Sequence, residues 1–275
     1  MELCQKNGVS YYRSELIPCP HGFSTRLGGV SREPHTASLN LAFGRGDAAE
    51  TVLENLERFA AAVGVPASSV VSLPQVHGND VIRVTAEDCG EGYFRASDRE
   101  ADGYVTTDPS VSLGIKTADC VPILLCGCAQ DGTPLAVSAL HAGWRGTVAR
   151  IAQNGVKALN GLGIPSGQIR AAIGPAIGMC CYEVDAPFRE TFYAAFGAGF
   201  LDGTFIATEK EGKFSADLTE INRRILMDAG VPEHAIDASA PCTCCHTELF
   251  FSHRYSSGKR GTMLSLIALQ GEEMS

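Results

Sequence analysis

Three segments of the sequence place a metal-binding or nucleophilic side chain at the end of a predicted strand. His77 follows a strand in LPQVHGNDV, Cys120 precedes a buried strand in KTADCVPILL, and His141 ends a strand in ALHAGWRG. One thiolate and two imidazoles are a typical ligand set for Zn²⁺, and they leave the fourth tetrahedral position free for water. Zinc can lower the pKa of that water to about 7, which makes it a nucleophile at neutral pH.

The spacing of these residues also allows other interpretations. The ligands are far apart in the sequence, and no C-x-x-C or H-E-x-x-H pair links them, so core or turn histidines and a buried thiol fit the pattern as well. A metal-free cysteine hydrolase would use the same residues, with Cys120 as the nucleophile and His141 or His77 as its base. A non-catalytic binding module is a third hypothesis, and a turnover assay would distinguish it.

Several arginines are candidate ligands for an anion. In HAGWRG a strand passes through glycines into a helix N-terminus, where backbone N–H groups favour an anion and Arg145 adds a positive charge suited to phosphate. Arg26 in FSTRLGG is a similar candidate. Arg254, Lys259 and Arg260 could face an anionic substrate near the C-terminus. For each residue the alternative is an exposed side chain in an ordinary turn.

Cysteines gather in two further segments. IGPAIGMCCYEV holds Cys180, Cys181 and the acid/base candidate Glu183, and APCTCCHTELFFSHR holds further thiols at 242–245. We interpret the vicinal pair as packed thiols and the second segment as a thiol-rich loop, because its CxC and CC spacings are tighter than those of usual zinc pairs. A second metal site or a redox-sensitive patch is the alternative. Asp119 could orient a histidine from behind the site.

The elements that would position these residues alternate between helices and short apolar strands. Asp47 is a candidate cap for the first helix, and VPILLC and LAVSAL have the apolar character of fully buried strands. We predict an α/β or α+β fold with mixed sheets, in a single domain over residues 1–275. Helices are predicted over 48–63, 144–160, 185–196 and 216–229, and strands between 70 and 140 and over 169–174, 235–239, 249–252 and 263–269.

Composition excludes several classes of protein. The 275 residues are 45% hydrophobic and 19% charged, which is typical of a globular chain. The net charge of -9 argues against a nucleic-acid partner, and no apolar run approaches the roughly 18 residues that span a membrane. The odd count of 11 cysteines indicates reduced thiols. Without a recognisable signal peptide, we expect a cytoplasmic monomer or homodimer.

The motifs occur in an order that resembles the YfiH-like laccase-domain family. This family is also called purine nucleoside phosphorylase-like, polyphenol oxidase or peptidoglycan editing factor, and the resemblance covers roughly residues 18–270. It implies a four-layer α/β/β/α sandwich and a metal site at His77, Cys120 and His141. The motifs are HGFSTRLGGVS, SLNLAFG, LPQVHGNDV, ADGYVTT, TADCVPILL, HAGWRGTV, IGPAIGMCCYEV, DLTEINRRIL and FFSHR.

The resemblance also implies substrates and reactions. It implies phosphorolysis of adenosine, inosine, guanosine and methylthioadenosine, and hydrolytic deamination of adenosine. The zinc site, with catalytic Cys120, His141 and Arg145, would supply the chemistry, and Arg26 or Arg145 would bind phosphate. Many members carry a TGR-like turn near the C-terminus, whereas this chain has GKRGTM, so the role of an arginine from that turn does not transfer directly to Arg260.

The laccase name can be tested by counting ligands. A four-copper oxidase needs roughly ten histidines and one cysteine, and its blue-copper centre takes the His₂Cys part of that set. This chain has 7 histidines, so it cannot build the full set. A single copper ion could still occupy the His₂Cys site, because copper binds more tightly than zinc in the Irving–Williams order. A copper-loaded phenol oxidase and a cysteine hydrolase of cell-wall peptide therefore remain the alternatives.

Overall fold

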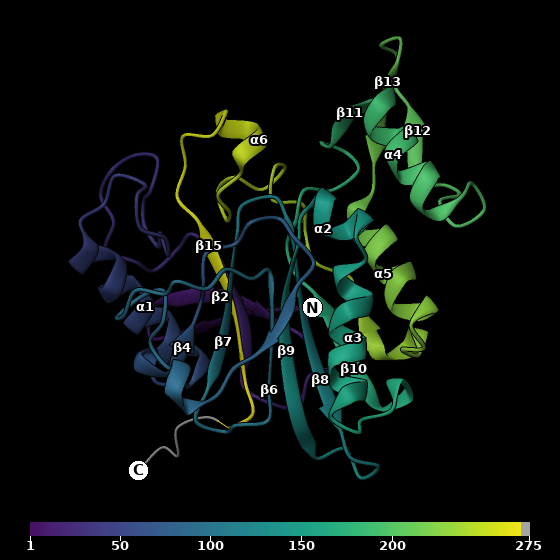
Figure 1. The fold of residues 1–275 in the computed structure, drawn as a ribbon. Helices are drawn as coiled ribbons and strands as arrows, with labels where there is room; N and C mark the ends of the chain where they lie inside the picture. Colours follow the sequence, from purple (N-terminus) through teal and green to yellow (C-terminus); the bar gives the residue numbers. More distant parts are fainter. Residues whose placement is uncertain (271–275) are drawn as a thin grey trace.

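The computed structural model describes residues 1–270 and arranges them in four layers (Figure 1). Two six-stranded sheets lie face to face, α1 (Ala49–Val63) covers the outside of one, and α3 (Ile151–Gly161) and α5 (Leu218–Asp228) cover the outside of the other. This arrangement confirms the predicted α/β/β/α sandwich with mixed sheets. The remaining helices are α2 (Trp144–Val148), α4 (Ala186–Phe196) and α6 (His253–Ser256).

The first sheet has the strand order β1-β2-β3-β15-β7-β4, in which only β4 runs parallel to its neighbour. Because β15 lies at its centre, the last described strand completes a sheet begun by the first strands. Its strands are β1 (Glu2–Lys6), β2 (Val9–Arg13), β3 (His21–Ser24), β4 (Val70–Val71), β7 (Ser112–Thr117) and β15 (Met263–Ala268).

The second sheet has the order β14-β10-β8-β9-β6-β5, with parallel pairs only at its two edges. A third sheet, β11-β13-β12, stands apart with α4 at the upper right of Figure 1. The strands of these two sheets are β5 (Val81–Arg83), β6 (Gly103–Thr106), β8 (Val121–Cys128), β9 (Pro134–Ala142), β10 (Ile169–Ile173), β14 (Ile236–Asp237), β11 (Glu183–Asp185), β12 (Phe205–Ala207) and β13 (Lys213–Ala216).

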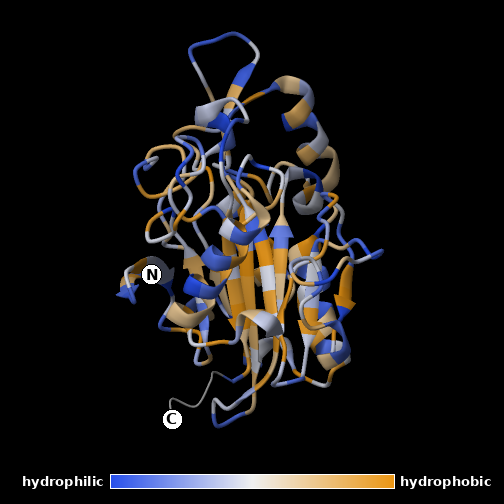
Figure 2. Cartoon of the chain, turned by 90° about the vertical axis from the view of Figure 1, so that its left-hand side faces the viewer, coloured by the Kyte–Doolittle hydropathy of each residue, from blue (hydrophilic) through white to orange (hydrophobic). Residues whose placement is uncertain are grey.

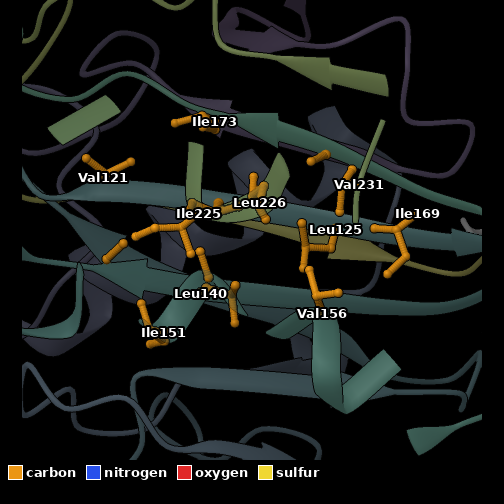
Figure 3. Close-up of a cluster of buried hydrophobic side chains, with 14 of the residues drawn as sticks. Val121, Leu125, Leu140, Ile151, Val156, Ile169, Ile173, Ile225, Leu226 and Val231 are labelled. Atoms are coloured by element: carbon orange, nitrogen blue, oxygen red, sulfur yellow. The ribbon is translucent and has the colours of Figure 1, made fainter. Parts of the chain in front are cut away.

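The central strands are buried on both faces, as their apolar sequences predict. Leu124 and Val137 point between the two sheets, whereas Leu125 and Leu140 point toward α3 and α5, since neighbouring residues of a strand face opposite sides. Figure 3 shows Leu125 and Leu140 among the side chains that the helices bring onto the second sheet. In Figure 2 the hydrophobic colour is accordingly concentrated in the strands.

Two predictions about helices are wrong in detail. Asp47 does not cap α1, because its carboxylate instead accepts hydrogen bonds from Ser31, Thr36 and Asn40 in the preceding loop. The predicted helix over 144–160 is two helices, because Arg150 adopts φ +60° and interrupts the hydrogen-bond ladder between α2 and α3.

One predicted strand is absent from the structure, and one sheet was missed. Residues 249–252 form no strand, and their backbone instead leads into α6. The third sheet was not predicted, because its strands are short and only partly buried and so lack a clear alternating pattern. No helix within residues 1–270 is both long enough and apolar enough to cross a membrane.

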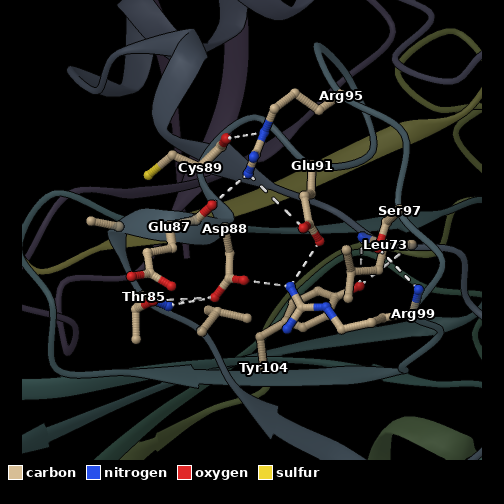
Figure 4. Close-up of polar contacts among 12 residues, drawn as sticks. Leu73, Thr85, Glu87, Asp88, Cys89, Glu91, Arg95, Ser97, Arg99 and Tyr104 are labelled. Carbon is tan, nitrogen blue, oxygen red and sulfur yellow. Dashed lines mark hydrogen bonds and ion pairs between the residues drawn. The ribbon is translucent and has the colours of Figure 1, made fainter.

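A polar network holds the long connection between β5 and β6. The Arg99 guanidinium binds Asp88 at 2.6 Å and Glu91 at 2.7 Å (Figure 4). At the base of this connection the buried Tyr104 hydroxyl accepts a hydrogen bond from the backbone N–H of Leu73 at 2.9 Å. These contacts fix both the start of β6 and the loop that follows β4, which are the segments that approach the candidate site.

Candidate metal centre

The register of the second sheet brings the ligands predicted from the sequence to one end of its strands. His141 on β9 lies opposite Pro122 on β8, and Cys120 lies two residues before Pro122. On the other side of β9, Gly103 pairs with Leu140, so Asp102, the residue before β6, lies beside His141. His77 belongs to the loop that leads into β5, the strand next to β6. Four chain segments therefore converge at the same end of the sheet.

His77, Cys120 and His141 form a compact group. The candidate ligand atoms of all three lie within 4.8 Å of one another, and Cys120 Sγ is 4.0 Å from His77 Nε2. A tetrahedral zinc ion with these ligands separates them by about 3.3–3.8 Å, so only small side-chain movements would be needed. His141 is buried, Cys120 is half-buried and His77 is exposed. The group therefore opens to solvent on the His77 side.

Asp102 is the residue that orients the group. Its carboxylate is fully buried and accepts a 2.6 Å hydrogen bond from His141 Nδ1, which leaves Nε2 of that ring to face the thiol. The same carboxylate accepts backbone hydrogen bonds from Val76 at 3.0 Å, His77 at 3.0 Å and Gly78 at 2.7 Å. Metal-ligating histidines commonly donate their second nitrogen to a carboxylate in this way. One side chain thus positions both histidines.

Gly143 packs against all three candidate ligands. A Cβ atom at this position would lie 2.9 Å from His77 Cδ2, 3.4 Å from Cys120 Sγ and 3.6 Å from His141 Cε1. A side chain here would crowd the histidine ring and narrow the space between the ligands. The glycine of HAGWRG therefore has a role beyond the strand-to-helix turn that the sequence indicates.

The electrostatics of the group favour a charged thiolate. Burial raises the pKa of the Cys120 thiol, but hydrogen bonds and positive charge from His141 and His77 outweigh it and lower the pKa to about 6. Burial lowers the pKa of His141, but its contacts with Asp102 and Cys120 outweigh this and raise the pKa to about 9. Burial likewise opposes ionisation of Asp102, and hydrogen bonds from His141 and Gly78 keep its pKa below the ordinary value. Cys120 is thus prepared to act as a metal ligand or a nucleophile.

Two pockets meet at this group. We name the first the aromatic pocket; it has a volume of about 370 Å³ and apolar walls that include Trp144, Ile177, Tyr182 and Leu218. We name the second the cationic pocket; it has a volume of about 300 Å³ and is lined by Arg45, Lys116, Arg260 and the ring of Phe43. His77, Cys120 and Arg260 line both, so the candidate ligands lie at the junction.

Arg260 and Arg145 are the cations best placed to receive an anion in the aromatic pocket. Arg260 donates to Thr262 at 2.8 Å, while its buried Nε has no partner in the described part of the chain, and burial lowers its pKa to about 10. Arg145 is exposed at the pocket wall, with its guanidinium 4.4 Å from the centre of the Trp144 ring. Within residues 1–270, neither arginine forms an ion pair.

Other predicted residues lie elsewhere. Arg26 donates to the backbone carbonyls of Ala37 at 2.8 Å and Thr247 at 2.9 Å, and among the residues described it lines neither pocket. Glu183 forms an exposed ion pair with Lys210 at 3.0 Å and is likewise absent from the described lining of both pockets. Roles of Arg26 in phosphate binding and of Glu183 as an acid or base stay predictions.

Asp119 does not orient a histidine. Its carboxylate accepts hydrogen bonds from Thr243 Oγ1 at 2.6 Å, Ser252 Oγ at 3.1 Å and the backbone N–H of Arg254 at 2.7 Å. Asp119 therefore ties the loop before α6 to the site. The orienting role suggested for Asp119 belongs to Asp102. The ADGYVTT motif contains Asp102, and its position just before a strand is the signal that could have identified this residue.

The two-sheet sandwich with a His-Cys-His group at the strand ends is the arrangement that the resemblance to the laccase-domain family implies. The model of the family described as multi-copper polyphenol oxidoreductase laccase matches residues 20–270, and this chain belongs to that family. The family resemblance identified from the motifs is thereby confirmed.

Three similar proteins give the comparison its detail. A purine nucleoside phosphorylase of Deinococcus radiodurans is 38% identical over 267 residues, which cover 97% of this chain and 95% of that protein. Adenosine deaminase RL5, from an unknown prokaryotic organism, is 35% identical over 240 residues, covering 84% and 87%. The crystal structure of the hypothetical protein YfiH from Bacillus licheniformis superposes with a TM-score of 0.87 at 33% identity, covering 98% of this chain and 99% of that one.

Replacing Asp102 by asparagine should weaken metal binding about 10–100-fold, because the amide cannot accept all the hydrogen bonds that fix His77 and His141. Competition with a fluorescent chelator measures the affinity, and circular dichroism checks the fold. Asp131→Asn, at an exposed position, is the matched control and should bind as the wild type does. Wild-type affinity in a folded Asp102→Asn protein would contradict the orienting role.

Alkylation of Cys120 in metal-depleted protein should increase with pH around a midpoint near 6, well below the ordinary midpoint near 8.5. Mass spectrometry of the peptide containing Cys120 measures the rate, and added zinc should protect the thiol. His141→Gln is the control, and it should move the midpoint upward because the stabilising positive charge is removed. An ordinary midpoint in the wild type would contradict the thiolate.

Proposed function

We propose that this protein is a zinc-dependent purine nucleoside phosphorylase that also deaminates adenosine. Its proposed substrates are phosphate and the nucleosides adenosine, inosine, guanosine and methylthioadenosine. The observation that carries the proposal is the position of His77, Cys120 and His141 at the junction of the aromatic pocket and the cationic pocket. The names of two relatives, a purine nucleoside phosphorylase and an adenosine deaminase, support the two reactions.

The donor set fits zinc. Two imidazole nitrogens and one thiolate supply three ligands, and the exposed side of His77 leaves the fourth position accessible to water or substrate. A bound zinc ion supplies Lewis acidity and lowers the pKa of a coordinated water. Copper could bind the same three ligands, which makes the native metal an experimental question.

A multi-copper site is not supported by the arrangement of side chains. Across residues 1–270, groups of three or more candidate ligands that lie this close occur at two places, and only one of them contains histidine. His21 and His246, for example, form hydrogen bonds with Cys19 O and Glu248 away from the metal centre. The family description therefore does not by itself favour four-copper oxidation in this chain.

In each proposed reaction one bond forms and one breaks. In phosphorolysis the phosphate forms a bond to the ribose carbon, and the base leaves with the bonding electrons and takes up a proton. In deamination water adds to the amino-bearing carbon of adenine and ammonia leaves, which gives inosine. Both need the nucleoside held with one face open to a nucleophile, and holding the reactants in place lowers the barrier.

We assign roles to the residues from the walls they form. Tyr182, Ile177 and Leu218 offer apolar contact area for the purine ring. Arg145 and Arg260 line the same pocket, and their guanidinium groups supply positive charge for phosphate. Cys120 and His141 act at the reacting centre as metal ligands, and Asp102 positions His141.

The zinc requirement is tested by measuring metal content and products together. His77→Ala, Cys120→Ala and His141→Ala should each lose the metal bound at this site and more than about 100-fold in activity, because each removes one of three ligands. Liquid chromatography of adenosine reactions run with and without phosphate separates adenine from inosine. Asp131→Asn is the control and should retain the metal and both products.

The alternatives give different results in the same experiment. Full activity of metal-depleted protein that is lost on alkylation of Cys120 would replace the proposal with a cysteine hydrolase. Nucleoside binding without any released base or ammonia would replace it with a binding module. Oxidation of a phenol only after loading with copper, with no nucleoside turnover by the zinc protein, would favour the oxidase.

Arg145→Ala should raise the KM for phosphate about 10-fold or more while changing adenosine deamination little, because only phosphorolysis uses the anion. Steady-state assays with varied phosphate measure the KM, and the rate of inosine formation without phosphate is the internal reference. Arg170→Ala, which removes an arginine outside the lining of both pockets, is the control variant. Equal losses in the two reactions would remove Arg145 from phosphate binding.

A further inference from the structure

Four cysteine side chains from two distant segments converge outside the metal centre described above. Cys245 Sγ is 3.4 Å from Cys180 Sγ and 3.4 Å from Cys181 Sγ, and Cys242 completes the group. All four sulfur atoms lie within 4.8 Å of one another. Cys244, although adjacent in sequence, is not part of the group.

Backbone contacts hold the two loops of this cluster together. Ala176 and Cys242 form a parallel β-bridge, in which Thr243 donates its N–H to the Ala176 carbonyl at 2.9 Å. The Gly178 N–H points at Cys242 Sγ, with a nitrogen–sulfur distance of 3.2 Å. A Cβ atom on Gly178 would lie only 3.2 Å from Cys242 Cβ and 3.4 Å from Cys180 Sγ. The two loops are therefore fitted closely against each other.

We propose that Cys180, Cys181, Cys242 and Cys245 bind a second zinc ion, which is structural. Four thiolates around zinc form a closed tetrahedral site, in which neighbouring sulfur atoms are separated by about 3.8 Å, within the range that the cluster spans. Each thiol that still carries its proton releases it to solvent on binding. With no coordination position left for water, this ion has no catalytic task.

The sequence contains half of the corresponding signal. Cys242 and Cys245 have the C-x-x-C spacing of zinc sites, but the intervening Cys244 makes the segment look like CxC and CC pairs. The other half is the vicinal pair Cys180 and Cys181, which lies more than sixty residues earlier. The β-bridge between the two loops and the contact of Gly178 with Cys242 bring the two halves together.

Disulfide bonds account less well for the same geometry. Cys245 is equally close to Cys180 and Cys181, and a disulfide could use only one of them. A bond would also require the sulfur atoms to approach to about 2.05 Å. A single ion satisfies all four thiols together.

The proposed ion would stiffen one wall of the aromatic pocket. Tyr182, which follows Cys181 directly, lines this pocket, and the Arg254 guanidinium donates to the carbonyl of Glu183 at 3.0 Å. On the other loop, Thr243 binds Asp119 at 2.6 Å, next to the ligand Cys120. The cluster therefore links the loop of Tyr182 to the loop of Thr243, and both loops contact the surroundings of the candidate metal centre.

Zinc analysis of full-length protein tests the proposal. The wild type, purified under reducing conditions and loaded with Zn²⁺ alone, should hold about two ions per chain after removal of excess metal. Cys245→Ser should hold about one, and Cys244→Ser, its adjacent matched control, should still hold about two. Equal zinc contents in the wild type and in a folded Cys245→Ser protein would overturn the second site.

Two further measurements separate this site from the first one and do not depend on the serine variant. Cys120→Ala should keep the Cys₄ ion, whatever happens to nucleoside turnover. Loaded with Co²⁺, it should show the intense thiolate-to-metal absorption of a four-sulfur site. Absence of this absorption would overturn the proposal. Disulfide bonds within the cluster, detected as a lower intact mass in protein purified under reducing conditions, would also overturn it.

Discussion

The candidate site depends on one buried carboxylate. Asp102 has no exposed surface, and burying a charge is costly unless hydrogen bonds compensate for it. Four N–H groups, three from the backbone of residues 76–78 and one from His141, provide that compensation. The buried carboxylate needs hydrogen-bond donors, and this need holds the His77 loop over the ends of the strands. The same contacts that stabilise Asp102 fix the two imidazoles.

The sheet supplies the other half of the arrangement. Because β8 and β9 are antiparallel neighbours, the residue before one strand and the last residues of the other necessarily lie together, and Cys120 and His141 need no loop to bring them into reach. His77 alone arrives on an irregular segment. A rigid pair and one loop-borne ligand also explain the gradient of exposure from His141 to His77.

The sequence was informative wherever one short segment carried the signal. The buried strands, α1 and the capped α5 follow from local periodicity, and the three metal-ligand candidates follow from residue types at strand ends. Asp102 was missed because its partners are twenty-four to thirty-nine residues away, and a lone aspartate before a strand is common. The break at Arg150 and the partners of Asp47 likewise depend on tertiary contacts that periodicity does not encode.

The exposure of His77 has a kinetic consequence. An ion in the site would be covered by β8 and β9 on the protein side, and His77, the exposed ligand, would lie on the side that faces solvent. Three hydrogen bonds fasten the loop of His77 to the Asp102 carboxylate. Protonation or loss of that carboxylate would loosen the loop and speed the exchange of the bound ion with solvent. Retention of the ion over time would then be governed by a residue that never touches it.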